Sequence, residues 1–384
     1  MKKYYYNSHY LNSNDISTVV DSLKRGILSQ GSYQKLLEEK IKKKFNVKYC
    51  IAVSSATAGL HLAYKSLGLK KNDYIITSSM TWNATTNAAI FCNATSKLVD
   101  ISDKNFCIDP KKLENFILKA KKKPKIIVPV HFGASLCNLR KISRIAKKFK
   151  IRVVEDASQA MGASYGKHKI GSCKYSDVTI FSLHPVKTIT SGEGGLVLTN
   201  SYKIFKEVKL MRSHSTFKSI KKEPWSTKAL KIGFNYRITE MQCALAYSQL
   251  KKLDKFLKKR SMIRKEYMNQ LKDYIGSIAF QEINHLDQSS NHMMIIKFNS
   301  PNFNLQKKYK IYDFFRKNNI YLTTKYYPLH NQYPFFLKKK KYPKSEEYYL
   351  RTFCFPIYYN LKKKEIIYIT NLIKKAINIF KLHV

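Results

Sequence analysis

The chain has 384 residues, 44% of them hydrophobic, and this length favours one large and one smaller domain over a single small core. Lysine and arginine outnumber aspartate and glutamate by 71 to 25, which gives a formal net charge of +46. The basic residues are mainly lysines scattered along the whole chain, a pattern that argues against a dedicated nucleic-acid-binding protein with clustered arginine and aromatic residues.

Seven cysteines lie far apart in the chain, and none forms a CxxC pair. This spacing indicates neither a zinc site nor a redox motif, and dispersed single cysteines suit a reducing compartment. The first ten residues lack the apolar core of a signal peptide, and no apolar run approaches membrane-spanning length. We therefore expect a soluble cytoplasmic protein with no bound metal and no membrane partner.

The first 160 residues alternate between helical and apolar extended segments. Helices are predicted at residues 14–26, 33–45, 58–67, 110–121 and 139–149, and residues 80–87 open another. Strands are predicted at residues 49–53, 74–77, 96–100, 125–130 and 151–155. This alternation predicts βαβ units and a mostly parallel sheet, in which ligands bind at the carboxyl ends of the strands. Four polar or aromatic residues each follow a predicted strand: Ser55, Trp82, His131 and Asp156.

Residues 178–200 form the most informative stretch of the chain. Two apolar segments, 178–181 and 196–199, read as buried strands, and the turn between them contains Pro185, Lys187 and a cluster of glycines. A lysine in such a turn, beside apolar walls, loses hydration, so its pKa falls and it becomes an amine nucleophile. The alternative is that Lys187 is one more solvated surface lysine.

Two further features each allow a structural and a functional interpretation. The small residues at 54–57 lead from a strand into a helix, so they form either a phosphate seat at the helix N-terminus or a simple N-cap. Trp82 stands at the start of a helix. Its ring either packs in the core or forms a flat surface on which an aromatic ligand stacks.

The remaining residues predict a smaller α+β domain. We expect one long helix at residues 241–274, a strand at 293–298, a helix at 305–318, a strand at 320–323 and a closing helix at 361–380. The basic stretch at 255–265 reads as a domain boundary, so the expected division is a large domain over residues 1–255 and a small domain over 256–384. A polar and aromatic loop at 325–331 lies between elements of the small domain.

Six separate motifs, in their order and spacing, resemble the DegT/DnrJ/EryC1/StrS sugar aminotransferases. They are Ser-Ala-Thr at 55–57, Trp82-Asn-Ala-Thr, Glu155-Asp-Ala-Ser-Gln-Ala, Phe181-Ser-Leu-His-Pro-Val-Lys with Gly-Glu-Gly-Gly at 192–195, Asn235-Tyr-Arg with Glu240, and Tyr327-Pro-Leu-His. The resemblance covers residues 4–380. It implies an α/β fold-type-I enzyme dependent on pyridoxal 5'-phosphate (PLP), with a mostly parallel central sheet flanked by helices and a smaller C-terminal α+β domain.

The resemblance also implies roles for individual residues. Lys187 would bind the aldehyde carbon of PLP and later move a proton, and Asp156 would pair with the protonated pyridine nitrogen. Trp82 would stack on the ring, and Gln159 would contact the side that carries the ring hydroxyl. The phosphate would be held by Ala56, Thr57 and Ser182 and by Asn235 of a second subunit, so we expect a homodimer with shared sites. His184, Arg237, Tyr327 and His330 would face a sugar nucleotide.

Within the family, the likeness is greatest to the subgroup that acts in pseudaminic-acid biosynthesis, which moves the amino group of L-glutamate to C4 of a UDP-linked 4-keto-6-deoxy-N-acetylhexosamine. Gln159, Ser215 and Thr216 depart from that subgroup, and residues 131–134 have a different order of residue types. These departures leave open another UDP-, dTDP- or GDP-linked ketosugar. A sugar dehydratase of the same fold would carry histidine in place of Lys187. A polyanion-binding protein without enzymatic activity is the remaining alternative.

Overall fold

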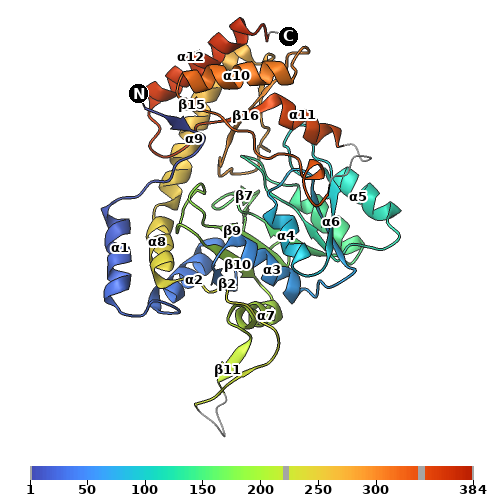
Figure 1. The fold of residues 1–384 in the computed structure, drawn as a ribbon, viewed down its shortest axis with the longest axis vertical. Coiled ribbons are helices and arrows are strands. Elements are labelled where there is room, and N and C mark those ends of the chain that lie inside the picture. Colours follow the sequence, from blue (N-terminus) through green and yellow to red (C-terminus); the bar gives the residue numbers. More distant parts are fainter. Residues whose placement is uncertain (1, 219–224, 336–341, 383–384) are drawn as a thin grey trace.

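The computed structural model describes residues 2–218, 225–335 and 342–382, and these residues build a central seven-stranded sheet (Figure 1). Its spatial order is β2-β10-β9-β6-β5-β3-β4. The bounds are β2 (Tyr49–Val53), β3 (Tyr74–Ser78), β4 (Thr95–Val99), β5 (Ile126–Val128), β6 (Arg152–Asp156), β9 (Val178–Ser182) and β10 (Gly195–Thr199). β4, β3, β5, β6 and β9 run parallel, whereas β10 is antiparallel to both β9 and β2. The predicted α/β fold with a mostly parallel sheet is therefore confirmed.

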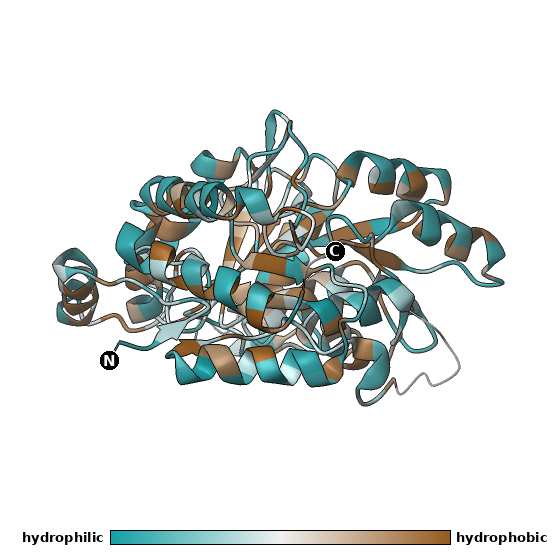
Figure 2. Ribbon diagram, turned by 90° about the horizontal axis from the view of Figure 1, so that it is seen from above, coloured by the Kyte–Doolittle hydropathy of each residue, from teal (hydrophilic) through white to brown (hydrophobic). Residues whose placement is uncertain are grey.

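Helices cover both faces of this sheet because its strands are apolar on both sides. One face packs against α3 (Ala56–Ser66), α4 (Ala84–Ile90) and α7 (Tyr202–Arg212). The other face packs against α2 (Ser32–Phe45), α5 (Pro110–Lys119), α6 (Leu139–Lys148) and α8 (Glu240–Leu250). Figure 2 shows the resulting distribution, with hydrophobic residues collected along the central strands and hydrophilic residues on the outer surfaces of the helices.

The prediction of one long helix at residues 241–274 is wrong. The chain forms α8, then α9 (Leu253–Gln270), and then a short 3₁₀ turn at Lys272–Tyr274. Between α8 and α9 the backbone N–H groups of Lys251 and Lys252 bond three residues back rather than four, which tightens the chain into a turn. The ammonium of Lys252 is held there by Asn12 and by the buried carboxylate of Asp15. The turn between α8 and α9 is therefore held by residues 12 and 15, near the beginning of the chain.

A second buried cluster surrounds a smaller antiparallel sheet near the C-terminus, drawn at the top of Figure 1. This sheet contains β13 (Ile278–Phe280), β14 (Met294–Phe298) and β16 (Thr352–Phe355), and α10 (Leu305–Lys317), α11 (Pro343–Arg351) and α12 (Lys363–Ile379) lie near it. Along α9, Phe256 packs in the first cluster and Ile263 in the second, so the helix passes from one core to the other. The expected division at residue 255 falls inside α9 and stays a prediction.

Several short elements were not expected from the sequence. β1 (Tyr4–Tyr5) pairs in parallel with β15 (Ile320–Tyr321), which joins the start of the chain to its C-terminal part. The hairpins are β7 (Ser164–Tyr165) with β8 (His168–Lys169), and β11 (Thr216–Lys218) with β12 (Thr227–Ala229). The hairpin that contains β11 projects from the bottom of the molecule in Figure 1, and α1 (Ser13–Lys24) packs beside α8.

Glu240, the first residue of α8, caps a different helix. Its buried carboxylate accepts hydrogen bonds from the backbone N–H groups of Gly31 (2.9 Å), Tyr33 (2.7 Å) and Gln34 (3.0 Å). These groups belong to the first turn of α2, where Gly31 provides no side-chain cap. A carboxylate at a helix N-terminus satisfies free donors and complements the helix dipole, so Glu240 fastens α2 to α8.

Replacing Glu240 by alanine should lower the free energy of unfolding by about 2–3 kcal/mol, because three buried N–H groups lose their charged acceptor. Denaturant unfolding followed by circular dichroism measures this change. Glu39→Ala is the matched control, since Glu39 is exposed and forms only a surface pair with Lys42; it should change stability by less than about 0.5 kcal/mol. Equal effects of the two substitutions would contradict the capping role.

Candidate active site

Lys187 lies in the turn after β9, at the carboxyl edge of the parallel strands. Its backbone N–H bonds to the carbonyl of His184 (2.9 Å), and the neighbouring carbonyl of Val186 accepts from Asn7 Nδ2 (2.5 Å). Part of the side chain remains accessible, but loss of hydration around the amine lowers the pKa of Lys187 to about 8. Asp156 opposes this pKa shift, and the charge of Lys325 adds to it. The amine is therefore partly neutral near physiological pH.

Asp156 ends β6, the strand next to β9, and is 5% exposed. Its Oδ2 accepts a hydrogen bond from Thr85 Oγ1 (2.8 Å), and its Oδ1 accepts from the backbone N–H of Ser158 (3.2 Å). Within the described residues these donors are neutral, and no ion pair joins Asp156 to a lysine, arginine or histidine side chain within 4.0 Å. The donors orient the carboxylate and leave its charge available for a cationic ligand group.

Aromatic and amide groups form a wall beside these two residues. Gln159 accepts from the backbone N–H of Gly133 (2.7 Å) and donates to the hydroxyl of Tyr326 (3.1 Å). The ring of Tyr326 lies 5.4 Å from that of Trp82, which is 59% exposed. An indole so exposed is not packed in the core, and its free surface suits a ring-shaped ligand better.

The start of α3 forms the third part of the site. Ser55 is the N-cap, and its hydroxyl accepts from the N–H of Ala58 (3.1 Å), while Ala56 and Thr57 begin the first turn. Gly195 allows the turn to approach closely, since a Cβ there would lie 2.5 Å from the carbonyl carbon of Ser55. Ser182 pairs with Gly195 across the β9–β10 ladder. This arrangement is typical of a phosphate-binding site, called the phosphate seat below, because it combines a helix N-terminus, a hydroxyl and a close approach of the backbone.

Residues 235–237 lie beside this seat, because the carbonyl of Tyr236 accepts from the N–H of Ser54 (2.9 Å). Asn235 is exposed and Arg237 half-buried. His184 is also exposed, with Nε2 3.9 Å from Glu193 Oε1, and partial loss of hydration lowers its pKa. Tyr327 is 49% exposed and packs edge-on against Tyr349.

Two histidines point away from this site. His330 is buried, its ring stacks on Tyr342 with centroids 4.5 Å apart, and its Nε2 lies 3.3 Å from Glu346 Oε1. The structure therefore does not bring His330 to the site, because its ring fills a small core between the 325–331 loop and α11. His131 is buried as well, with Nε2 3.1 Å from Glu155 Oε2, and its position indicates packing.

Three residues of this neighbourhood were not expected from the sequence. Thr85 bonds to Asp156, Tyr326 bonds to Gln159, and Lys325 acts electrostatically on Lys187. Each lies in a stretch that the sequence marked as unusual, either residues 80–87 or residues 325–331. Only the fold shows which side chain of each stretch faces the site.

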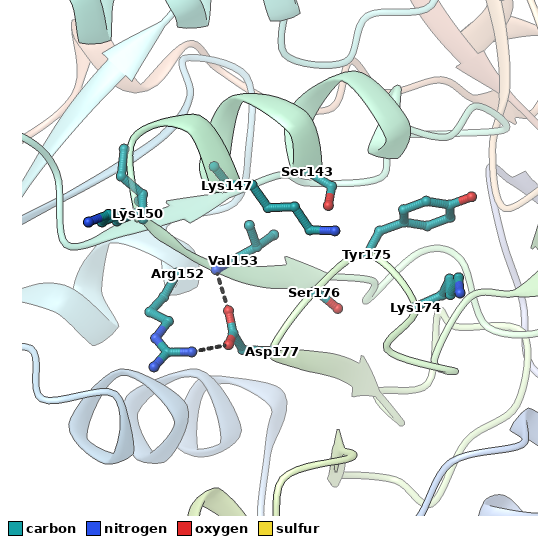
Figure 3. A pocket seen from close by; sticks show the side chains of 11 residues that line it. Ser143, Lys147, Lys150, Arg152, Val153, Lys174, Tyr175, Ser176 and Asp177 are labelled. Carbon is teal, nitrogen blue, oxygen red and sulfur yellow. Dashed lines mark hydrogen bonds and ion pairs between the residues drawn. The ribbon is translucent and has the colours of Figure 1, made fainter.

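A separate cavity of about 430 Å³ lies between α6 and the loop at residues 174–177 (Figure 3). Figure 3 shows Arg152 turned toward Asp177, with Nη1 2.8 Å from Oδ1, and the backbone N–H of Val153 donates to Oδ2 of the same carboxylate (2.8 Å). Arg152 is the first residue of β6 and Asp156 the last, so this cavity lies at the opposite edge of the sheet from Lys187.

The described parts of the chain contain no group of three or more histidine, cysteine, aspartate or glutamate side chains arranged to hold a metal ion. Their seven cysteines are all free. Among the same residues, none of the helices is long and apolar enough to cross a membrane.

Residues 9–374 match the DegT/DnrJ/EryC1/StrS aminotransferase family. A Campylobacter jejuni protein named UDP-4-amino-4,6-dideoxy-N-acetyl-beta-L-altrosamine transaminase is 37% identical over 307 residues, which cover 79% of this chain and 78% of the relative. The spore coat polysaccharide biosynthesis protein SpsC of Bacillus subtilis is 27% identical over 94% of each chain.

Solved structures with the same fold include Helicobacter pylori PseC, described as an aminotransferase involved in the biosynthesis of pseudoaminic acid. It superposes with a TM-score of 0.90 and 27% identity, covering 98% of this chain and 100% of that one. A putative sugar aminotransferase of Streptococcus pneumoniae in its PLP form also has a TM-score of 0.90, at 22% identity over 99% of each chain, and this likeness concerns the fold alone.

Lys187 should react with amine-directed reagents at lower pH than an ordinary lysine. In cofactor-free protein, its labelling should be half-maximal near pH 8, since the amine is protonated and inert below its pKa and neutral above it. Mass spectrometry of peptides labelled over a pH series measures the midpoint, and the exposed Lys203 in the same digest is the internal control. If Lys187 titrates together with Lys203, its amine is not desolvated.

Proposed function

Because the chain belongs to the DegT/DnrJ/EryC1/StrS aminotransferase family and is a PLP-dependent sugar aminotransferase, we propose that it transfers the amino group of L-glutamate to C4 of a UDP-linked 4-keto-6-deoxy-N-acetylhexosamine. The observation that carries most weight is the position of Lys187, Asp156 and the α3 N-terminus around one edge of the sheet. The name of the Campylobacter jejuni relative supports this substrate. The product would enter the synthesis of a pseudaminic-acid-type surface sugar.

The residues of the site fit PLP group by group. A carboxylate held by neutral donors suits the pyridine nitrogen, the first turn of α3 with Ser182 suits the phosphate, and the exposed face of Trp82 suits the ring. When bound, PLP supplies an electrophilic carbon and a ring that withdraws electrons from the reacting carbon. The nitrogen, the phosphate and the ring face each therefore have a suitable partner.

The protein's own contribution is binding and proton transfer. Lys187 first acts as a nucleophile, for which a pKa of about 8 leaves a useful neutral fraction. Once the amino group of glutamate has displaced it from the cofactor, the free Nζ would move the proton from the α-carbon of glutamate to the cofactor carbon. In the second half of the reaction, Nζ would take that proton back and deliver it to C4 of the sugar. The carboxylate of Asp156 would stabilise positive charge on the ring nitrogen. The net positive charge of the chain attracts the anionic sugar nucleotide.

We further propose that two chains share each active site. Asn235 is exposed beside the phosphate seat, and several large apolar side chains are exposed near the β11–β12 hairpin and at the C-terminal end of α4. These are Phe91, Trp225, Leu230 and Ile232, with exposures of 54%, 82%, 61% and 82%. Such residues suit an interface between subunits, across which Asn235 reaches the partner's phosphate. The free cysteines and the nucleotide-linked substrate favour a cytoplasmic enzyme.

The reaction can be tested on purified enzyme saturated with PLP. L-Glutamate should bleach the near-visible absorbance of the bound cofactor, and a panel of UDP-, dTDP- and GDP-linked ketosugars should give an aminated product only with the UDP-linked 4-ketosugar. Lys187→Ala should lower kcat at least about 10³-fold, whereas Lys203→Ala, which removes an exposed lysine, should not. Absence of bleaching in the wild type would refute the aminotransferase assignment, and amination of another sugar would refute the substrate.

Shared sites can be tested by mixing two inactive variants. Lys187→Ala and Asn235→Ala homodimers should each be impaired, and subunit exchange between them should restore about a quarter of the wild-type activity. In the mixed dimer, one site combines an intact Lys187 with an intact Asn235 of the other chain. Turnover measured before and after exchange gives the result, and wild type mixed with Lys187→Ala serves as the reference. No recovery despite exchange would show that each subunit uses its own Asn235.

A further inference from the structure

Lys325 lies at the start of the loop at residues 325–331. Its ammonium is over the ring of Tyr6, and the residue after Tyr6, Asn7, donates to the carbonyl of Val186, beside Lys187. The hydroxyl of Tyr348 donates to the carbonyl of Lys325 (2.5 Å), and the next residue, Tyr326, is tied to Gln159. The Nζ of Lys325 lies 5.0 Å from the ring centre of Tyr6 and 5.9 Å from that of Tyr326. The ammonium is therefore held between two aromatic rings, a position that cation–π attraction favours.

The charge of Lys325 reaches the amine of Lys187. Loss of hydration is the main cause of the lowered pKa of Lys187, and the charge of Lys325 adds to it. Burial likewise lowers the pKa values of His184 and His292, with a smaller contribution from Lys325. No aspartate or glutamate within the described residues forms an ion pair with Lys325. A half-buried cation without a counter-charge, placed beside a second amine, is electrostatically unfavourable until an anion binds between them.

The position of this cation indicates which anion it receives. The α-carboxylate of an amino acid is one bond from the carbon whose proton Lys187 removes. In a nucleotide sugar, by contrast, the diphosphate is attached at C1, across the ring from the reacting C4. A cation whose charge reaches the amine of Lys187 is therefore better placed for the donor's carboxylate than for the diphosphate.

We propose that Lys325 binds the α-carboxylate of the amino donor and makes the enzyme specific for α-amino acids. This inference rests on the proposed aminotransferase function and adds the residue that selects its first substrate. A charge-assisted hydrogen bond of this kind also orients the α-carbon toward Lys187. Tyr6 and Tyr326 hold the lysine in place, so little side-chain freedom is lost when the donor binds.

The test compares Lys325→Met, which removes the charge, with Lys325→Arg, which keeps it, and with Lys310→Met, which removes an exposed lysine of α10. The rate of cofactor bleaching against L-glutamate concentration gives the donor affinity. Lys325→Met should weaken it about 10- to 100-fold, Lys325→Arg by less than about 5-fold, and Lys310→Met not measurably. Wild type should prefer L-glutamate to 4-aminobutanoate, which lacks the α-carboxylate, and Lys325→Met should lose most of that preference.

A second readout needs no turnover. In cofactor-free Lys325→Met, the labelling midpoint of Lys187 should move above pH 8, since a repelling charge is gone, whereas in Lys325→Arg and Lys310→Met it should stay near pH 8. Wild-type-like thermal unfolding of the variants excludes a folding defect.

Three outcomes would overturn the proposal. The first is unchanged donor affinity in Lys325→Met with an unchanged midpoint. The second is a raised KM for the ketosugar in Lys325→Met with unchanged donor affinity, which would assign Lys325 to the diphosphate instead. The third is an equal loss of donor affinity in Lys310→Met, which would indicate an effect of net charge. Failure of the wild type to accept glutamate would refute the proposed function itself, a result distinct from all three.

Discussion

The parallel pairing of β6 with β9 is the constraint on which the rest of the site depends. It sets Asp156 opposite Ile180, so the carboxylate at the end of one strand lies one strand away from the turn that carries Lys187. β10 then returns antiparallel, and its first residue, Gly195, brings the turn against the start of α3. An acid, an amine and a helix N-terminus thus meet at one edge without a long loop. The cavity at the opposite edge is basic, and its carboxylate, Asp177, is already paired with Arg152.

The Lys187 turn is supported from behind by a buried guanidinium. Arg260 of α9 is 3% exposed and donates to the carbonyl of Ile357 and to Oδ1 of Asn7, both at 2.9 Å. Asn7 in turn donates to the carbonyl of Val186. Burial lowers the pKa of Arg260 to about 10, and several oxygen acceptors offset the loss of water. The smaller C-terminal core is therefore connected to the reacting lysine through hydrogen bonds rather than by chain connectivity alone.

The sequence predicted what depends on local pattern and missed what depends on distant contacts. The strands of the large sheet were predictable because each is a short apolar run between polar turns. The break between α8 and α9 was not, since Lys252 meets Asp15 only in the folded chain. The same holds for the site: the strand ends marked Asp156 and the turn marked Lys187, but the role of Thr85 depends on a partner 71 positions away. His330 was misplaced because its neighbours, Tyr342 and Glu346, lie beyond the loop that suggested it.

The pairing of β1 with β15 has a consequence for biosynthesis. Tyr4 and Tyr5 pair with Ile320 and Tyr321, so β1 must wait for a strand that is translated about 300 residues later. Asn7 follows directly on β1, so its contact behind Val186 waits for the same event. A nascent chain can thus assemble the large sheet before β15 is made, but the turn that bears the reactive amine gains its final support only once β15 is in place. Activity should accordingly appear late in maturation, after most of the secondary structure has formed.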